Sequence, residues 1–309
     1  MFEKALVMYI YAETPIHPGS GTVIGGAVDL PIQRERHTEF PMIQGSSLKG
    51  VLRNSTCLVK IDNKCKQCNK TQETVEKCEI LKQIFGSPEG VGGISVTDAR
   101  ILAFPVRTLK GVFGWITCPL VLDRYKRDLG LVGIEVDWKI PKPSGDEEAE
   151  VCKNSNLTEN YVYIEDLQLK CDENENVDKI AEQIAKNLPE DEAYEEIREK
   201  LKRDLVIVSD NVFRDLVSLT TEVVTRIKID PKTGTVDKKV GGLWSEEYLP
   251  TDTIMYSLIL IPSRLNNLKP EEIAEEFKKY DEKILHMGGD ETVGKGFAMI
   301  KLIEGREAD

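Results

Sequence analysis

One stretch of this chain reads Gln44-Gly45-Ser46-Ser47-Leu48-Lys49-Gly50-Val51-Leu52-Arg53 and leads from a proline- and glycine-rich loop, residues 15–45, into a predicted helix. Ser46 or Ser47 suits the N-cap, because a serine hydroxyl accepts a hydrogen bond from a free backbone N–H. Lys49 and Arg53 are four residues apart and share one helix face. With the positive end of the helix dipole, this face could bind a phosphate backbone. An ordinary cap with a solvated basic face explains the pattern equally well.

A second stretch, near the C-terminus, reads Gly288-Gly289-Asp290-Glu291-Thr292-Val293-Gly294-Lys295-Gly296-Phe297. Its glycines would let backbone N–H groups approach phosphates, and it adds a hydroxyl and a cation. The expected order of helix, loop and strand matches neither a P-loop nor a dinucleotide-binding fingerprint. The alternative is a turn whose glycines only satisfy positive φ angles. The candidates for phosphate contact here are Gly288, Gly289, Thr292, Gly294, Lys295 and Gly296.

The acidity of the chain is local. Its 309 residues carry a net charge of −12, with 40% hydrophobic and 30% charged residues, which is a globular composition. Residues 146–204 hold 19 Asp and Glu against 8 Lys and Arg, a net of −11 that leaves about −1 for the rest. The net charge therefore does not exclude a nucleic-acid partner. Since no membrane-span or signal-peptide pattern occurs, we expect a cytoplasmic protein without a membrane partner.

Strand and helix patterns mix without a regular βα repeat, which favours an α+β fold. The clearest hairpin is 221–249, where residues alternate at period two on either side of the turn Asp230-Pro231-Lys232-Thr233-Gly234. The stretch 141–160 is polar and resembles a lid, and Asp210 could cap a short helix. We expect strands at 4–13, 93–106, 112–118, 161–169, 205–208, 252–262 and 296–303, and helices at 47–59, 73–85, 119–130, 176–188, 190–203 and 270–285.

Four of the seven cysteines cluster within residues 57–78. Cys65 and Cys68 form one Cys-x2-Cys knuckle, and Cys57 and Cys78 lie further away on either side. Such a set could close a structural Zn²⁺ site. The outer spacings are unusual, so four free thiols are an equal alternative.

A carboxylate, several cations and two histidines occur in the long N-terminal loop. Asp29 precedes Arg34, Arg36 and His37, and a carboxylate in this setting could hold a hard metal ion or accept a proton. A lone Asp in a loop is more often a turn residue. His17 and His37 could act as acid–base groups or as hydrogen-bonded structural imidazoles.

Two acids and two aromatic residues lie at the base of the predicted hairpin. Strand alternation puts Glu246 and Tyr248 on one face and Glu247 on the other. These residues could face the same groove as Asp29. The alternative is that the acids lie on the surface of an edge strand.

These pieces, in this order, resemble the RAMP superfamily of CRISPR–Cas proteins, and most of all the multi-copy backbone subunit of the type III-B (Cmr) effector complex. The resemblance spans nearly the whole chain, although 60–84 and 141–204 look variable. The cysteine cluster departs from the family pattern, so the resemblance does not imply zinc. The residues that carry it are Thr14 through Gly21, Asp29 through His37, Gly45 through Arg53, Phe104 through Gly111, Phe213 through Leu216, Gly241 through Pro250, and 286–297.

The resemblance implies one domain over residues 1–309 with a ferredoxin-like (RRM-like) core. Its additions would be a Cys-containing helical insert at 57–85, a lid with acidic helices at 141–204, and a protruding β-hairpin thumb at 221–249. Copies would stack head to tail on a guide RNA, beside other Cmr subunits. The guide would pair with target RNA while the protein reads backbone shape.

The implied activity is a divalent-metal-dependent endoribonuclease that cleaves target RNA at regular intervals within the assembled complex. Asp29 would help to hold Mg²⁺ or Mn²⁺ or the attacking 2′-OH, leaving a 2′,3′-cyclic phosphate and a 5′-OH. The candidate catalytic assistants are His17, Glu246, Glu247 and Tyr248. The candidate RNA-binding residues outside the 288–296 loop are Ser46, Ser47, Lys49, Arg53, Arg34 and Arg36.

Two other functions remain open from the sequence. One is a non-catalytic guide-RNA scaffold of the same fold, in which Asp29 is only a turn residue. The other is a free-standing endoribonuclease that matures guide RNA. The long hairpin, the acidic insert and the surroundings of Asp29 favour the target-cleaving subunit over the second alternative.

Overall fold

The computed structural model describes residues 2–22, 26–56, 79–87, 90–236, 242–263 and 268–305. The clustered cysteines lie outside these ranges, so their zinc site stays a prediction; they are Cys57, Cys65, Cys68 and Cys78. None of the helices within the described ranges is long and apolar enough to cross a membrane.

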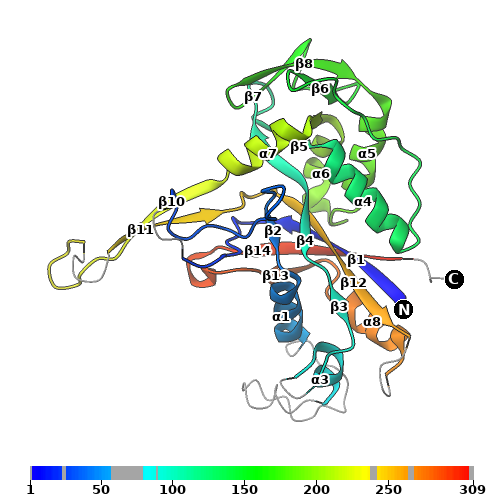
Figure 1. Ribbon diagram of the computed structural model, residues 1–309, viewed down its shortest axis with the longest axis vertical. Coiled ribbons are helices and arrows are strands. Elements are labelled where there is room, and N and C mark those ends of the chain that lie inside the picture. Colours follow the sequence, from blue (N-terminus) through cyan, green and yellow to red (C-terminus); the bar gives the residue numbers. More distant parts are fainter. Residues whose placement is uncertain are drawn as a thin grey trace.

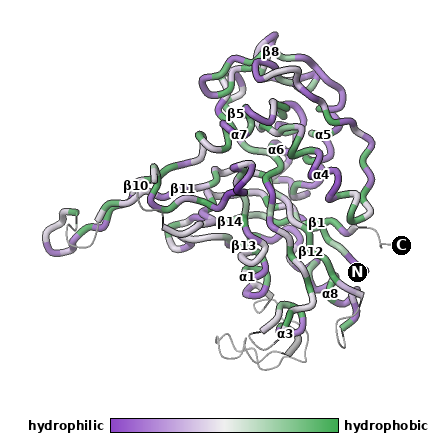
Figure 2. The backbone as a smooth tube through the Cα atoms, in the orientation of Figure 1, coloured by the Kyte–Doolittle hydropathy of each residue, from purple (hydrophilic) through white to green (hydrophobic). Residues whose placement is uncertain are grey.

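A large mixed β-sheet is the frame of the molecule (Figure 1). At its centre β1 (Phe2–Ala12) lies antiparallel to β12 (Ile254–Pro262) on one side and to β14 (Phe297–Glu304) on the other. β4 (Ala99–Arg107) pairs with β12, and β13 (Lys283–His286) pairs with β14. The last eight residues of β1 are all buried, as expected for an apolar central strand covered on both faces (Figure 2).

Helices α1 (Gly45–Thr56) and α8 (Pro270–Lys278) lie on one side of these strands (Figure 1). α8 packs against β1 and β12 through an apolar face that includes Ile273 and Phe277. The shorter elements nearby are α3 (Glu79–Phe85), β2 (Met42–Ile43), which pairs with β4, and β3 (Ser95–Val96), which pairs with β12.

The sheet continues past β4 into the upper part of Figure 1. Its further strands are, in order, β5 (Phe113–Thr117), β9 (Leu205–Val208), β6 (Glu148–Val151), β8 (Leu167–Glu173) and β7 (Tyr161–Ile164). Two of these pairings, β5 with β9 and β6 with β8, are parallel. The helices of this part are α4 (Pro119–Leu131), α5 (Glu175–Lys186), α6 (Glu195–Asp204) and α7 (Asp210–Leu219).

Strands β10 (Glu222–Ile227) and β11 (Leu243–Tyr248) form a separate antiparallel hairpin that projects from the body (Figure 1). Its period-two pattern predicts this correctly. Ile227 lies opposite Leu243, and both side chains are exposed. The base of this hairpin brings the candidate catalytic residues together.

The predicted helix at 270–285 is wrong in its second half. α8 ends at Lys278, and Glu282 has a φ of +54°, which an α-helix does not accommodate. The chain then continues as β13, antiparallel to β14. The glycine-rich loop 288–296 therefore connects two strands rather than a helix and a strand.

Other details of the predicted elements also differ from the structure. α1 begins at Gly45, so Ser46 and Ser47 lie in its first turn and neither is its N-cap. The single strand expected at 161–169 is two paired strands, β7 and β8. Asp210 is the first residue of α7, and the side chain of Ser209 caps that helix by accepting from the Val212 N–H.

Candidate functional site

Asp29 lies on a short extended segment that runs alongside β11. The Leu30 N–H donates to the Ser245 carbonyl at 3.0 Å, and the Glu247 N–H donates to the Leu30 carbonyl at 3.0 Å. β11 is thus bordered by β10 on one edge and by this segment on the other. Because Glu246 and Glu247 are both buried, the alternative that they are surface acids of an edge strand is wrong.

The carboxylate of Asp29 is exposed, and its hydrogen bonds within the described chain come from Ser245. The Ser245 backbone N–H donates to Oδ2 at 2.8 Å, and the Ser245 hydroxyl donates to the same oxygen at 2.9 Å. The backbone bond and then the hydroxyl bond lower the pKa of Asp29 below its ordinary value, since both favour the charged form. Asp29 is therefore an anion at neutral pH, and Oδ1 accepts none of these bonds.

Glu246 lies on the face of β11 opposite Ser245 and Glu247. Three side chains donate hydrogen bonds to its carboxylate. Trp244 Nε1 lies 2.6 Å from Oε1, Arg226 Nε lies 2.9 Å from Oε2, and the Tyr248 hydroxyl also donates to Oε2. Burial acts to raise the pKa of Glu246, but these hydrogen bonds outweigh it and lower the pKa. Glu246 and Tyr248 do share a face, as strand alternation predicts. No hydrogen bond in the described part of the chain joins them to Asp29, and a common groove stays a prediction.

Tyr248 is fixed from several directions. Its hydroxyl accepts from Arg226 Nη2 at 2.8 Å and lies 2.8 Å from a carboxylate oxygen of Asp290. The ammonium of Lys295 lies 5.1 Å from the centre of its ring, and the His17 ring centre lies 5.4 Å away. Burial, together with the nearby carboxylates, raises the pKa of Tyr248, so the phenol stays protonated at neutral pH.

His17 is held by a backbone carbonyl. Its Nδ1 lies 2.6 Å from the carbonyl oxygen of Glu247, which can only accept, so Nδ1 carries the proton. In the neutral imidazole, Nε2 therefore has a free lone pair. This arrangement gives His17 the tautomer that a general base needs at Nε2.

The glycine-rich loop packs on the segment that carries His17. The Gly289 N–H donates to the His17 carbonyl at 3.0 Å. Gly288 has a φ of +83°, and a β-carbon there would lie 2.3 Å from the His17 carbonyl oxygen. A glycine is required at this position by both conformation and space. The loop thus places Asp290 and Lys295 beside Tyr248, and its phosphate contacts stay a prediction.

The carboxylate of Glu247 joins several segments of the site through hydrogen bonds. Its Oε1 accepts from Arg34 Nη2 at 2.5 Å and from the Thr221 hydroxyl at 2.8 Å, and its Oε2 accepts from the Ile32 N–H at 3.0 Å. Arg34 also donates to two backbone carbonyls. The guanidinium of Arg34 is therefore engaged inside the protein, where it holds the Asp29 segment to the hairpin.

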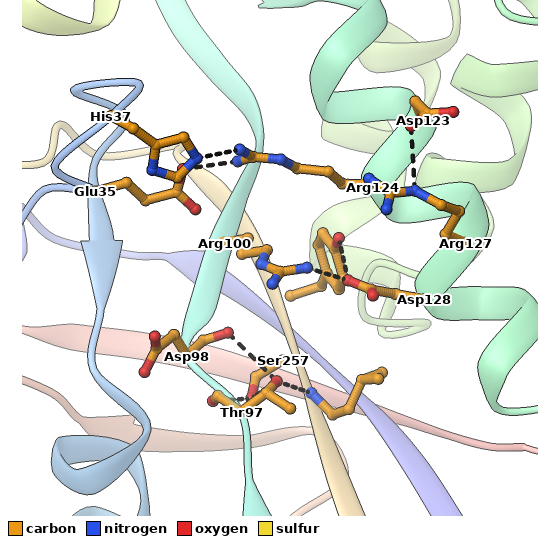
Figure 3. A network of polar contacts seen from close by, with 12 residues as sticks. Glu35, His37, Thr97, Asp98, Arg100, Asp123, Arg124, Arg127, Asp128 and Ser257 are labelled. Carbon is orange, nitrogen blue, oxygen red and sulfur yellow. Dashed lines mark hydrogen bonds and ion pairs between the residues drawn. The ribbon is translucent and has the colours of Figure 1, made fainter.

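The next part of the N-terminal loop is fastened to α4 (Figure 3). Arg124 Nη1 donates to Glu35 at 2.7 Å, and Arg124 Nη2 donates to His37 Nε2 at 3.0 Å. Burial acts to raise the pKa of Glu35, but hydrogen bonds from Thr38 and Arg124 outweigh it and lower the pKa. Arg36 of this run is exposed, and its contact with a phosphate stays a prediction.

The candidate RNA-binding residues of α1 lie apart from the hairpin (Figure 1). Ser46 and Ser47 are exposed in the first turn. Lys49 donates to the Ile94 carbonyl at 2.9 Å, and partial burial lowers its pKa. Arg53 lines an open groove beside Phe85. Their contact with RNA stays a prediction.

Within the described ranges, no cluster of three or more His, Cys, Asp or Glu residues could hold a metal ion. Glu246 and Glu247 are each bound by an arginine, so neither presents a free carboxylate. Asp29 presents Oδ1. One carboxylate oxygen fits Mg²⁺, which keeps several waters and takes further ligands from substrate phosphates.

Sequence reasoning missed four residues of this site: Ser245, Arg226, Asp290 and Arg124. Each contacts a residue that the sequence had singled out, across at least 20 positions of the chain. Ser245 is a single serine in a strand, a pattern without a specific signal. Arg226 did occur in the alternating hairpin, and the structure places it opposite Trp244.

Comparisons with known proteins identify the family of the chain. A family model described as the RAMP superfamily matches residues 9–299. The chain is 44% identical to the "CRISPR system Cmr endoribonuclease Cmr4" of Pyrococcus furiosus, over 97% of this chain and 96% of that protein.

Solved structures show the same fold. The crystal structure of oligomeric Cmr4 from Pyrococcus furiosus superposes with a TM-score of 0.72 at 39% identity, covering 98% of this chain and 99% of that one. A chain of the type III-B Cmr-beta complex bound to cognate target RNA gives a TM-score of 0.71 at 21% identity, covering 97% and 98% of the two chains.

Proposed function

Since the chain belongs to the RAMP superfamily, we propose that it is the backbone subunit of a type III-B Cmr complex and cleaves target RNA paired with a guide RNA. The observation that carries the proposal is the exposed, charged carboxylate of Asp29, fixed at the base of the projecting hairpin. The 44% identical relative, matched over nearly its whole length, is named an endoribonuclease.

The core is of the ferredoxin-like type in this proposal. The strand order β14-β1-β12-β4, with α1 following β1 and α8 following β12, supports it. The hairpin β10–β11 is the thumb. A solved relative is described as oligomeric. In this proposal, copies of the chain stack head to tail, and other Cmr subunits close the open ends.

The reaction is attack of a ribose 2′-oxygen on the adjacent phosphorus. The P–O5′ bond breaks, so that the products are a 2′,3′-cyclic phosphate and a 5′-OH. The Asp29 carboxylate orients the attacking hydroxyl, and His17 Nε2 is placed to accept a proton. The protonated phenol of Tyr248 donates to Glu246, is held by Arg226 and Asp290, and orders this side of the site beside two cations.

A divalent ion, Mg²⁺ or Mn²⁺, would be held by Asp29 and by phosphate oxygens of the RNA. When bound it supplies positive charge for the phosphate oxygens. Lys49, Arg53, Arg36, the first turn of α1 and the 288–296 loop contact the guide backbone. Removal of one such contact weakens binding without changing sequence preference.

The test uses complexes reconstituted with wild-type or Asp29→Ala protein and a labelled RNA complementary to the guide. We expect regularly spaced products with Mg²⁺ or Mn²⁺, none with EDTA, and none from the Asp29→Ala complex. Asp166→Ala is a matched control, because its carboxylate is fully exposed and it lies between β7 and β8, which are apart from the hairpin (Figure 1). Unchanged cleavage by an assembled Asp29→Ala complex would favour a non-catalytic scaffold subunit. Cleavage of a guide-RNA precursor by the isolated chain would favour the free-standing processing enzyme.

A further inference from the structure

We propose that Ser245 is a positioning residue for target-RNA cleavage, acting by holding one oxygen of Asp29 so that the other faces the RNA. The inference rests on the proposed function and deepens it, because it concerns the same carboxylate. It assigns a role to a residue on the hairpin strand that is itself not a titratable group.

Asp29 and Ser245 are joined by three hydrogen bonds. The Ser245 N–H and hydroxyl both donate to Oδ2 of Asp29, at 2.8 and 2.9 Å. The Asp29 N–H donates to the Ser245 hydroxyl oxygen at 3.0 Å, so the hydroxyl proton is directed toward Oδ2. Both Ser245 donors thus hold the carboxylate through Oδ2, and neither bonds to Oδ1.

The backbone on both sides of this pair is tied down independently of the hydroxyl. Leu30 exchanges backbone hydrogen bonds with Ser245 and Glu247, and the Ile32 N–H donates to the Glu247 carboxylate. Removal of the hydroxyl therefore leaves the segment docked on β11. What it removes is one of the two bonds that orient the carboxylate.

An exposed carboxylate without such a partner samples several rotamers, and only some of them present Oδ1 to a substrate. Mutation of a residue that orients a catalytic group through a hydrogen bond typically lowers activity by about 10- to 100-fold. A merely structural role for Ser245 would instead show in hairpin stability and in RNA binding.

The experiment compares Ser245→Ala, Ser245→Thr, Asp29→Ala and the double variant Asp29→Ala/Ser245→Ala in reconstituted complexes. Thr225→Ala is the matched control, because Thr225 lies directly opposite Ser245 on β10 and is exposed. The measurements are the single-turnover cleavage rate at saturating target, the affinity for target RNA, complex assembly, and thermal unfolding of the purified subunit.

We expect Ser245→Ala to lower the cleavage rate by about 10- to 100-fold with unchanged target affinity and assembly. Ser245→Thr should restore the rate to within a few-fold, since it returns the hydroxyl, and Thr225→Ala should cleave as wild type. In the Asp29→Ala background, Ser245→Ala should cause no further loss, because the two residues act as one unit.

The proposal is overturned if Ser245→Ala cleaves at the wild-type rate while Asp29→Ala does not. It is also overturned if the lost rate follows lost assembly or lost thermal stability, or if Ser245→Ala lowers the residual rate of Asp29→Ala by the same factor. Undiminished cleavage by Asp29→Ala would instead contradict the proposed function itself.

Discussion

The guanidinium of Arg34 and the carboxylate of Glu247 form an ion pair at 2.5 Å with 16% and 7% of their side chains exposed. The pair joins the N-terminal loop to β11 across 213 positions of the chain. Arg34 was a candidate for RNA contact from its place in a basic run, and the structure gives its charge a partner inside the protein.

Loss of this pair should destabilise the fold. Arg34→Met leaves Glu247 buried without a counter-ion, and we expect the free energy of unfolding to fall by about 3–5 kcal/mol. Arg36→Met, at an exposed position, should change it by less than about 0.5 kcal/mol while weakening guide-RNA binding. Denaturant unfolding of both variants and of the wild type measures these free energies. An Arg34→Met variant as stable as Arg36→Met would show that the ion pair does not stabilise the fold.

Removal of the Tyr248 hydroxyl should impair cleavage more than folding. Tyr248→Phe leaves Glu246, Arg226 and Asp290 without their shared partner, and we expect cleavage to fall by about 10- to 100-fold. Tyr256→Phe is the control, because Tyr256 is a buried tyrosine of β12 whose hydroxyl donates to Asp128. The cleavage rate and the melting temperature should both be measured. A comparable loss of cleavage in the two variants would refute a specific role for Tyr248.

Two glycines of the 288–296 loop should respond differently to alanine. Gly294→Ala meets no atom within 4 Å but has a φ of +79°, so we expect a cost of about 1–2 kcal/mol from backbone strain. Gly288→Ala has similar strain and also a contact of 2.3 Å with the His17 carbonyl, which adds about 1–3 kcal/mol.

Thermal unfolding separates these two costs, and cleavage assays should show that only Gly288→Ala disturbs the His17 side of the site. If both variants are equally stable, the close approach of Gly288 to His17 does not constrain the protein.

Glu35 makes stability depend on pH. Its pKa is lowered in the folded protein, so its contribution is fully present above the ordinary value of about 4.5 and is lost as the pH falls through the lower folded value. Glu35→Gln should therefore be less stable than wild type at pH 7. The difference should shrink as the pH falls from about 4.5, where Glu35 of the unfolded chain begins to bind a proton, through the lower pKa of Glu35 in the folded protein. Denaturant unfolding of both proteins from pH 3 to 7 measures it, and a constant difference would contradict the assignment.

The elements that the sequence predicted well are those whose signal is local. β1 and the β10–β11 hairpin follow from apolar or alternating residues within one short window. The prediction was wrong at the junction between α8 and β13. Glu282 there has a left-handed conformation, and no glycine or proline in the sequence marks the change.

The candidate site was predictable in its residues but not in its contacts. Family resemblance singled out Asp29, His17, Glu246 and Tyr248, and the structure places all four around the base of the hairpin. The partner of Asp29 lies 216 positions away, and no local pattern distinguishes it from other strand serines. Which carboxylates are paired with arginine and which is free follows from tertiary packing alone.

β11 has a different neighbour along each of its edges: the arm strand β10 on one side and the Asp29 segment on the other. The hairpin arm and the segment that carries Asp29 are thus hydrogen-bonded to the same strand. In the proposed complex, a tilt of the hairpin against a neighbouring copy or a nucleotide would therefore be transmitted through β11 to Asp29. The position of the hairpin in the proposed complex would then affect the orientation of the Asp29 carboxylate.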